Sequence, residues 1–170
     1  MRFFKKANLF LLLLFLCIPG SSYAEVTKEQ LKAVYLYNFL SFVKWENNTE
    51  VNICVIGNKE VSDLLEQIHQ KQASPIPFIV RPLTNAKDIS SCQIAFLDGS
   101  QDKHLKNFIT NSQSQTSLTV SDSPGFAKQG GVIEFVQRNN NLKLQINLTN
   151  AKKRKLKISS RLLKVSEVVE

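Results

Sequence analysis

The sequence predicts a single α/β domain built on a mixed sheet, with helices on both faces of the sheet. Three observations lead to this class. Short apolar segments alternate with helical segments between residues 51 and 112, an order that favours parallel strands joined by crossover helices. Two further apolar segments within 132–148 flank a polar turn and predict a terminal β-hairpin. The 170 residues contain no repeat and no Pro- or Gly-rich linker, so they amount to one domain.

The first 24 residues have the pattern of a secretory signal. Three basic residues stand in the first six positions, an apolar run follows at 9–18, and Ser22-Tyr23-Ala24 places small residues at the −3 and −1 positions of a cleavage site. The apolar run is too short to span a bilayer. Leu16 before Cys17 argues against lipoprotein processing, which requires a small residue there. We therefore expect residues 1–24 to be removed and residues 25–170 to be exported as the mature domain.

The composition of this mature chain excludes several classes of protein. Apolar residues make up 43% and charged residues 21% of the sequence, as in ordinary globular proteins. The leader contains three of the 22 Lys and Arg residues and none of the 14 acidic ones, so its removal lowers the net charge from +8 to +5. No apolar run of membrane length remains, which argues against a transmembrane span in the mature chain. The length is sufficient for a core without disulfide staples.

Hydrophobic periodicity places the elements of the first half. Residues 28–43 carry apolar side chains on more than one face, which predicts a largely buried helix. Gly57 closes a short apolar run and marks a turn from strand to helix. Prolines at both ends of the segment 77–82 indicate an edge strand. The expected helices cover 28–43, 59–71 and 101–112, and the expected strands cover 51–57, 77–82 and 92–98.

The second half changes to strands that follow one another directly. A strand is expected at 117–122, the hairpin at 132–137 and 142–148, a polar helical stretch at 149–155, and a last helix at 159–168. Ser159 is a typical N-cap for that last helix. Its core-facing stripe at helical spacing is expected to consist of Ile158, Leu162, Val165 and Val169.

The residues offer little for catalysis. His69 and His104 stand in separate expected helices without a metal-type spacing to Cys, Asp or Glu, so both read as surface helix residues. The sequence contains no nucleophile elbow, P-loop or dinucleotide fingerprint. Gly57 and the Asp98-Gly99 pair follow strands but are not specific signals. We therefore predict no catalytic residue, no metal site and no cofactor, and hence no enzyme.

Two cysteines remain in the mature chain, Cys54 and Cys92. Both fall in or beside expected core strands, and export exposes them to an oxidising compartment. If the two strands are neighbours, a bridge between them is sterically feasible. The alternative is two separate buried thiols that behave as small apolar residues. A redox catalyst is disfavoured because no C-x-x-C spacing is present.

A basic run begins near residue 152. Seven positive charges fall within thirteen residues: Lys152, Lys153, Arg154, Lys155, Lys157, Arg161 and Lys164. One reading is a solvated helix face. The other is a surface that meets anionic lipid headgroups or an acidic partner. No nucleic-acid partner is expected, because the chain is exported and the run has no interleaved aromatic residues.

Two positions are candidates for contact with a protein partner. Phe126 lies on a glycine-bounded loop at 121–131 and serves either as a lid on the core or as an exposed anchor. Leu163 falls about 100° around the expected last helix from the core stripe, between Arg161 and Lys164. An apolar residue with a cationic rim is typical of a partner site. We therefore predict partner contacts at Phe126, Arg161, Leu163 and Lys164.

The chain resembles the YfiR-like family of periplasmic proteins over about residues 29–169. No single segment is decisive, but their order and spacing are specific. The resemblance rests on LKAVYLYNFLSFVKW (31–45), ICVIG (53–57), CQIAFLD (92–98), LTVSDSPGFAKQGGVIEF (118–135), LQINLTNA (144–151) and LKISSRLLKVSEVV (156–169). It implies a three-layer α/β/α domain with a mixed sheet, located in the periplasm.

The resemblance also implies a function and a disulfide. It implies a repressor that binds the periplasmic sensor part of an inner-membrane diguanylate cyclase, which lowers cyclic di-GMP signalling and biofilm formation. It favours the bridge between Cys54 and Cys92. This chain departs from the family at Glu46, where proline is usual, and it lacks the second cysteine pair of the best-known member. Redox switching through such a second pair therefore does not carry over.

A second function fits the sequence less specifically. The chain would serve as a periplasmic small-molecule-binding protein if Tyr35, Tyr37 and Phe39 lined an aromatic pocket. An apolar partner face would also suit a homodimer.

Overall fold

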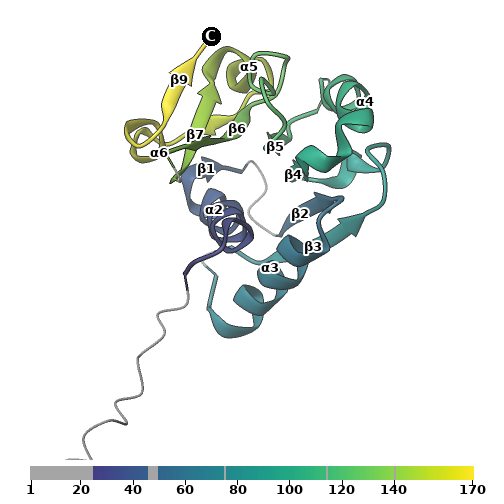
Figure 1. The fold of residues 1–170 in the computed structure, drawn as a ribbon, viewed down its shortest axis with the longest axis vertical. Coiled ribbons are helices and arrows are strands. Elements are labelled where there is room, and N and C mark those ends of the chain that lie inside the picture. Colours follow the sequence, from purple (N-terminus) through teal and green to yellow (C-terminus); the bar gives the residue numbers. More distant parts are fainter. Residues whose placement is uncertain (1–24, 46–49, 75, 114, 140) are drawn as a thin grey trace, which may run out of the picture.

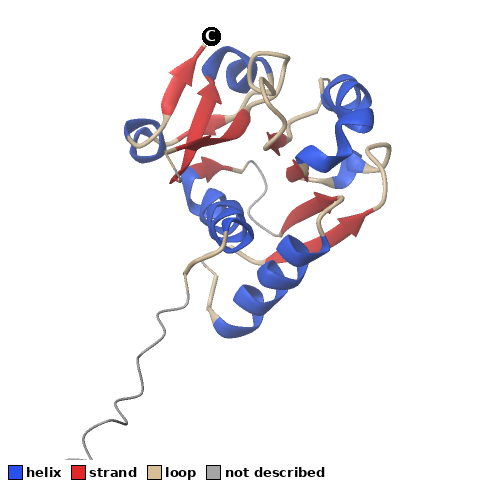
Figure 2. Ribbon diagram, in the orientation of Figure 1, coloured by secondary structure: helices blue, strands red, loops and turns tan. Residues whose placement is uncertain are grey.

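The computed structural model describes residues 25–45, 50–74, 76–113, 115–139 and 141–170, which form a mixed sheet between two layers of helices (Figures 1 and 2). The expected secretory leader, residues 1–24, lies outside the described residues. Among the residues that are described, none of the helices combines the length and apolar character that a bilayer crossing requires.

The seven-stranded sheet has the order β3-β2-β4-β5-β6-β7-β9. Its first five strands are parallel, β7 runs antiparallel to β6, and β9 runs parallel to β7. The strands are β2 (Val51–Ile56), β3 (Phe78–Leu83), β4 (Ile94–Leu97), β5 (Leu118–Ser121), β6 (Ile133–Arg138), β7 (Asn141–Asn147) and β9 (Glu167–Val169). A separate antiparallel pair joins β1 (Val43–Lys44) to β8 (Lys157–Ile158). The expected parallel half, terminal hairpin and edge position of β3 are confirmed.

The helices begin where the sequence provides caps. Thr27 forms a capping box with Gln30, and the side chains of Asn58 and Ser159 accept hydrogen bonds from backbone amides in the first turns that they cap. Gly57, at φ 84°, makes the turn from β2 into the following helix. The helices are α2 (Lys28–Phe42), α3 (Lys59–Lys71), α4 (Asp102–Ser112), α5 (Leu148–Lys153) and α6 (Ser160–Lys164), with 3₁₀ turns at Ile89–Ser91 and Gly99–Gln101.

Strand alternation divides the core into two parts, one on each face of the sheet. On β2, Ile53 and Val55 pack in a cluster with buried residues of α2 and α3. Their neighbours Cys54 and Ile56 point to the other face and pack in a second cluster with α4. In Figure 1, α3 and α4 accordingly lie on opposite sides of the central strands. The expected α/β domain with helices on both faces is confirmed.

The C-terminal segment differs from expectation. The last helix ends at Lys164 instead of 168, and the chain then forms the short strand β9 against β7. Of the expected core stripe, Leu162 is buried, whereas Val165 is 69% exposed. The β-branched side chains of this segment favour an extended strand when a neighbouring strand offers hydrogen bonds. Tertiary pairing thus overrides the helical spacing.

Candidate functional site

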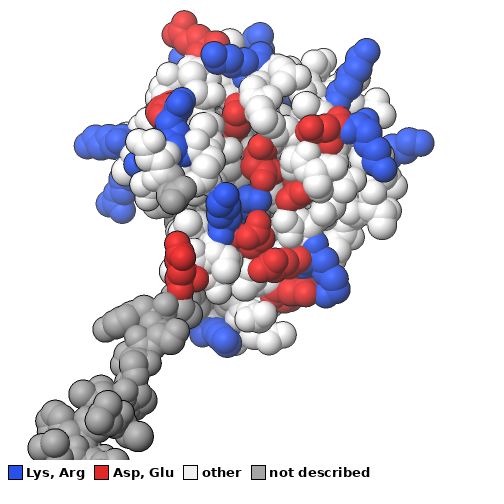
Figure 3. Space-filling view, viewed as in Figure 1, with Lys and Arg blue, Asp and Glu red and all other residues white. Residues whose placement is uncertain are grey.

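A buried ion-pair cluster lies where α2 crosses the carboxyl ends of β4 and β5. Lys32 is only 6% exposed, and its ammonium lies 2.6 Å from the carboxylate of Asp122. The same ammonium lies 3.9 Å from Asp98 and 3.5 Å from Glu29. In Figure 3, acidic side chains form a band through the middle of the visible face. One ammonium is therefore shared by three carboxylates.

Backbone and amide groups fix the two aspartates. The amide nitrogen of Asn58 donates to Asp98 over 2.7 Å, and the backbone N–H of Ser100 donates to the same carboxylate over 3.0 Å. The backbone N–H of Gly99 donates to Asp122 over 2.7 Å. Asp98 and Asp122 thus stand at the ends of neighbouring parallel strands, and Asp122 is tied to the loop that follows Asp98. Such strand ends are where open α/β sheets place their ligands.

These contacts shift two pKa values. Burial tends to lower the pKa of Lys32, but the hydrogen bond and charge of Asp122, aided by Asp98 and Glu29, outweigh burial and raise it. Burial tends to raise the pKa of Asp98, but hydrogen bonds from Ser100 and Asn58 and the charge of Lys32 lower it. Both groups are therefore held in their charged forms.

The sequence reading missed this cluster. The Asp98-Gly99 pair was interpreted as a non-specific signal. The available signal was topological, because Asp98 and Asp122 each follow a short apolar strand directly. The carboxyl ends of adjacent parallel strands meet at one edge of the sheet. Lys32 carried no local signal, since a lysine among the apolar residues of a helix gives no indication of its partner.

A cavity of about 360 Å³ opens beside the cluster. Its wall combines charged groups with apolar side chains: Lys28, Lys32, Asp122, Pro124, Glu134, Phe135, Val136, Gln137 and Leu142. The expected aromatic residues of α2 do not meet around a common pocket. Tyr35 and Phe39 pack on each other and on Phe135, whereas Tyr37 packs against Phe78. The interpretation of Tyr35, Tyr37 and Phe39 as one pocket lining is therefore wrong.

The loop after β5 is folded inward around a buried glutamate. The carboxylate of Glu134, 5% exposed, accepts hydrogen bonds from the backbone N–H groups of Gly125 and Ala127. Phe126 between them is fully buried and packs against Phe108 of α4. Phe126 is thus part of the core, and its assignment as an exposed partner anchor is corrected. The Glu134 carboxylate gives two backbone N–H groups an acceptor and so holds this loop, with the Phe126 ring, against the sheet.

The basic run contains one buried cation and six exposed ones. Arg154 is 5% exposed, and its guanidinium donates to the backbone carbonyls of Ser112 and Gly130 and to the hydroxyl of Ser112. Burial lowers the pKa of Arg154, although an arginine remains charged at any ordinary pH. Arg154 is therefore a structural residue that joins α5 to α4. The other cations of the run are exposed: Lys152, Lys153, Lys155, Lys157, Arg161 and Lys164.

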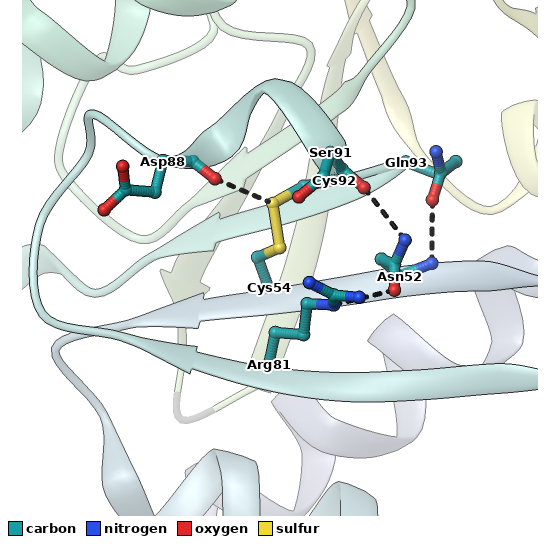
Figure 4. The surroundings of a disulfide bond; sticks show 7 residues. All are labelled: Asn52, Cys54, Arg81, Asp88, Ser91, Cys92 and Gln93. Atoms are coloured by element: carbon teal, nitrogen blue, oxygen red, sulfur yellow. Dashed lines mark hydrogen bonds between the residues drawn. A yellow bond between two sulfur atoms is a disulfide. The ribbon is translucent and has the colours of Figure 1, made fainter.

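The structure contains the Cys54–Cys92 bridge between β2 and the 3₁₀ turn before β4 (Figure 4). The two Cα atoms are 5.8 Å apart, the usual spacing for a disulfide, and both residues are buried. Cys92 follows the 3₁₀ turn and is not in the strand where the sequence placed it. Asn52 braces the same region, because it donates to the carbonyl of Ser91 and accepts from Arg81. The bridge is thus built into the core packing.

The predicted partner residues of α6 lie at the surface. Arg161 and Lys164 are exposed, and Leu163 is half-buried with one side on the main core cluster. The border position that the sequence predicted for Leu163 is what the structure has. His69 packs edge-on against Phe78, and His104 is half-buried on α4. In the part of the chain that is described, no group of three His, Cys, Asp or Glu residues is arranged to hold a metal ion.

The mixed sheet, the buried bridge and the polar cluster at the strand ends define a small disulfide-bridged α/β domain. The chain belongs to the YfiR/HmsC-like family (DUF4154), whose profile matches residues 29–167. The family resemblance seen in the sequence is confirmed. The YfiR-like family is one of periplasmic regulators of diguanylate cyclases.

Comparisons with solved structures show the fold alone. The ABC domain in complex with L-Trp from Streptococcus pneumonia matches with a TM-score of 0.55 at 12% identity, over 81% of this chain and 60% of that one. A conserved domain protein from Vibrio cholerae O1 biovar El Tor matches with a TM-score of 0.57 at 12% identity, over 86% of this chain and 62% of that one. The chain therefore spans less than two thirds of each of these proteins. No curated protein matches it.

Proposed function

We propose that this protein binds the periplasmic sensor part of an inner-membrane diguanylate cyclase and holds the cyclase inactive. Repression would lower cyclic di-GMP and with it biofilm formation. The observation that carries the proposal is the family match over residues 29–167, nearly the whole of the expected mature domain. The secretory pattern of residues 1–24 and a buried disulfide both suit a periplasmic protein.

The docking surface that we assign to the cyclase is centred on Leu163. Its side chain is partly open to solvent, with exposed Arg161 and Lys164 beside it in sequence. An apolar contact with a charged rim is the usual composition of a protein interface. The surface lies next to β9, at one end of the seven-stranded sheet. Phe126 has no part in it, because its ring is buried.

Co-purification with the solubilised cyclase tests this assignment. Leu163→Asp should reduce recovery of the cyclase at least tenfold, since a central apolar contact in an interface contributes about 2 kcal/mol. Ile79→Asp is the matched control, because Ile79 is 39% exposed on β3, at the opposite end of the sheet. Circular dichroism melts of both variants establish that they fold. Full recovery of the cyclase with a folded Leu163→Asp protein would refute this docking surface. Failure of the unaltered protein to recover any cyclase would refute the proposed function.

Small-molecule binding is a second candidate, favoured by the cavity beside Lys32 and Asp122. This cavity presents both signs of charge and an apolar wall that includes Phe135. Such a lining suits a small zwitterion with an apolar group. Calorimetric titration with free amino acids, compared between the unaltered protein and Phe135→Ala, tests the idea. Absence of heat with every amino acid would leave regulation by protein contact as the function.

A further inference from the structure

Charge is divided unequally along this chain. Residues 25–134 contain ten basic and twelve acidic residues, whereas residues 135–170 contain nine basic and two acidic ones. The net charge is therefore −2 in the first part and +7 in the last 36 residues. Of these nine cations, Arg154 is buried and Arg138 pairs with Glu167 at 3.1 Å. Charge asymmetry of this kind is typical of proteins that meet an anionic surface.

The pairing of β1 with β8 brings two positively charged side chains next to each other. Lys44 and Lys157 occupy directly opposed positions in this antiparallel pair. Directly opposed residues point to the same face of a ladder, and both lysines are exposed. Their neighbours Val43 and Ile158 form the inward-facing pair. Like charges at opposed positions destabilise a sheet, so this arrangement has a cost that an anionic ligand would relieve.

A second lysine in this segment has an unfavourable backbone. Lys155 has φ 58°, the left-handed conformation that ends α5 and that glycine adopts without strain. Leu156 is buried, whereas Lys155 and Lys157 on either side of it are exposed. Lys155 thus occupies a position that glycine would fill with less strain. We call Lys44, Lys155 and Lys157 the basic ladder.

The elements after the basic ladder add exposed apolar side chains. Val165 is 69% and Val168 is 48% exposed. In Figure 3, basic side chains lie on the α6 side of the molecule and also over α4, on either side of the acidic band. The basic ladder does not line the cavity beside Lys32. Flexible lysines and small exposed apolar groups suit a planar array of phosphates better than a discrete acidic peptide in a groove.

We propose that the basic ladder docks this domain on anionic phospholipid headgroups of the membrane that faces the periplasm. The inference goes beyond the proposed function and takes from it only the periplasmic location. Docking on the membrane would hold the domain at the surface in which its partner is anchored. It would also raise the local concentration of the domain beside that partner.

Vesicle flotation with protein purified from the periplasmic fraction tests the proposal. Binding is expected to phosphatidylcholine vesicles that contain phosphatidylglycerol, and not to phosphatidylcholine alone. A lysine near an anionic membrane strengthens binding about fivefold. Lys44→Gln/Lys157→Gln should therefore weaken binding about 30-fold. The matched control Lys103→Gln/Lys106→Gln removes the same charge from exposed positions on α4 and should change binding less than about twofold.

Lys155→Gly gives an independent readout, because it should raise the melting temperature while it weakens vesicle binding about fivefold. The proposal would be overturned if the Lys44→Gln/Lys157→Gln and Lys103→Gln/Lys106→Gln proteins lost vesicle binding equally. It would also be overturned if binding did not depend on phosphatidylglycerol. Absence of vesicle binding would also overturn it. Loss of cyclase recovery in Lys44→Gln/Lys157→Gln, measured separately by co-purification, would then assign the ladder to an acidic protein. The assay contains no cyclase, so its failure leaves the proposed function standing.

Discussion

Lys32 of α2 and Asp122, which follows β5, form an ion pair with 2.6 Å between the ammonium and the carboxylate. The pair fastens the first helix of the domain across the carboxyl end of the parallel sheet. Asp98 lies close enough to share the same ammonium, at 3.9 Å. The domain thus has one polar anchor on the face that α2 covers, in addition to the apolar contacts of this helix.

Removing the lysine should destabilise the protein strongly. Lys32→Met leaves Asp98 and Asp122 close together and largely buried without their cation, which costs about 3 kcal/mol. Urea unfolding measures the loss. The matched control is Lys59→Met, because Lys59 pairs with Asp63 in an exposed i,i+4 arrangement. The control should change stability by less than about 1 kcal/mol. Equal effects of the two substitutions would contradict the central role of Lys32.

The same cluster predicts how stability depends on pH. The pKa of Asp98 is lowered from its ordinary 3.8, so its contribution is present above pH 3.8 and is lost as the pH falls through the folded-state value. The pKa of Lys32 is raised from 10.5, so its contribution is present below pH 10.5 and is lost as the pH rises beyond that. Stability should therefore fall at both extremes.

Asp98→Asn should flatten the acid side of this profile. Melting temperatures measured between pH 5 and pH 2.5 should fall less steeply in the variant than in the unaltered protein, although the variant starts lower at pH 7. Asp88→Asn, at an exposed loop position, should keep the original slope. A variant that follows the original acid limb in full would show that Asp98 is not the group responsible.

Sequence reasoning recovered the elements whose signal is local. The bounds of α3 match the prediction, because Asn58 caps a helix with regular apolar spacing and Gln72 follows its last turn. The hairpin of β6 and β7 was recovered because alternation and a polar turn coincide. The two-residue strands β1 and β8 are too short for any periodicity, and their pairing joins segments more than a hundred residues apart. Such contacts leave no trace in a local window.

Some features of the candidate site could likewise be predicted from the sequence, and others could not. The residues alone left Cys54 and Cys92 open between a bridge and two separate thiols, and the family resemblance favoured the bridge that the structure contains. The border position of Leu163 followed from helical spacing. Burial of Arg154 was not predicted, because its partners are carbonyl groups on distant segments that carry no side-chain signal. The same holds for Phe126, whose loop is drawn inward by Glu134.

The disulfide should be structural. It closes a loop between residues 38 positions apart, for which chain entropy predicts about 4 kcal/mol of stabilisation. Cys54→Ala/Cys92→Ala should lose most of this free energy of unfolding and become insensitive to reductant. Thiol titration of the unfolded, unreduced protein should find almost no free thiol, and two reactive thiols would refute the bridge. Recovery of the cyclase should fall only with the folded fraction of the variant.

The last prediction concerns the contact between Gly131 and Phe126. A Cβ at Gly131 would overlap the buried Phe126 ring, so Gly131→Ala should cost about 1–3 kcal/mol. Gly125→Ala is the contrasting case, because its new Cβ has no neighbour closer than 3.4 Å and meets only the strain of φ 76°. That strain is worth about 1–2 kcal/mol.

A double-mutant cycle separates the overlap from the strain. Phe126→Leu costs stability by itself, because it removes part of a fully buried ring, but it makes room for the new methyl group. It should therefore recover part of the loss in the Gly131→Ala background and none in the Gly125→Ala background. Phe126→Asp should fail to fold, because it would bury a carboxylate against the ring of Phe108. A Phe126→Asp protein with an unchanged melting temperature would show that this side chain faces solvent, and the loop would again be a candidate surface for the partner.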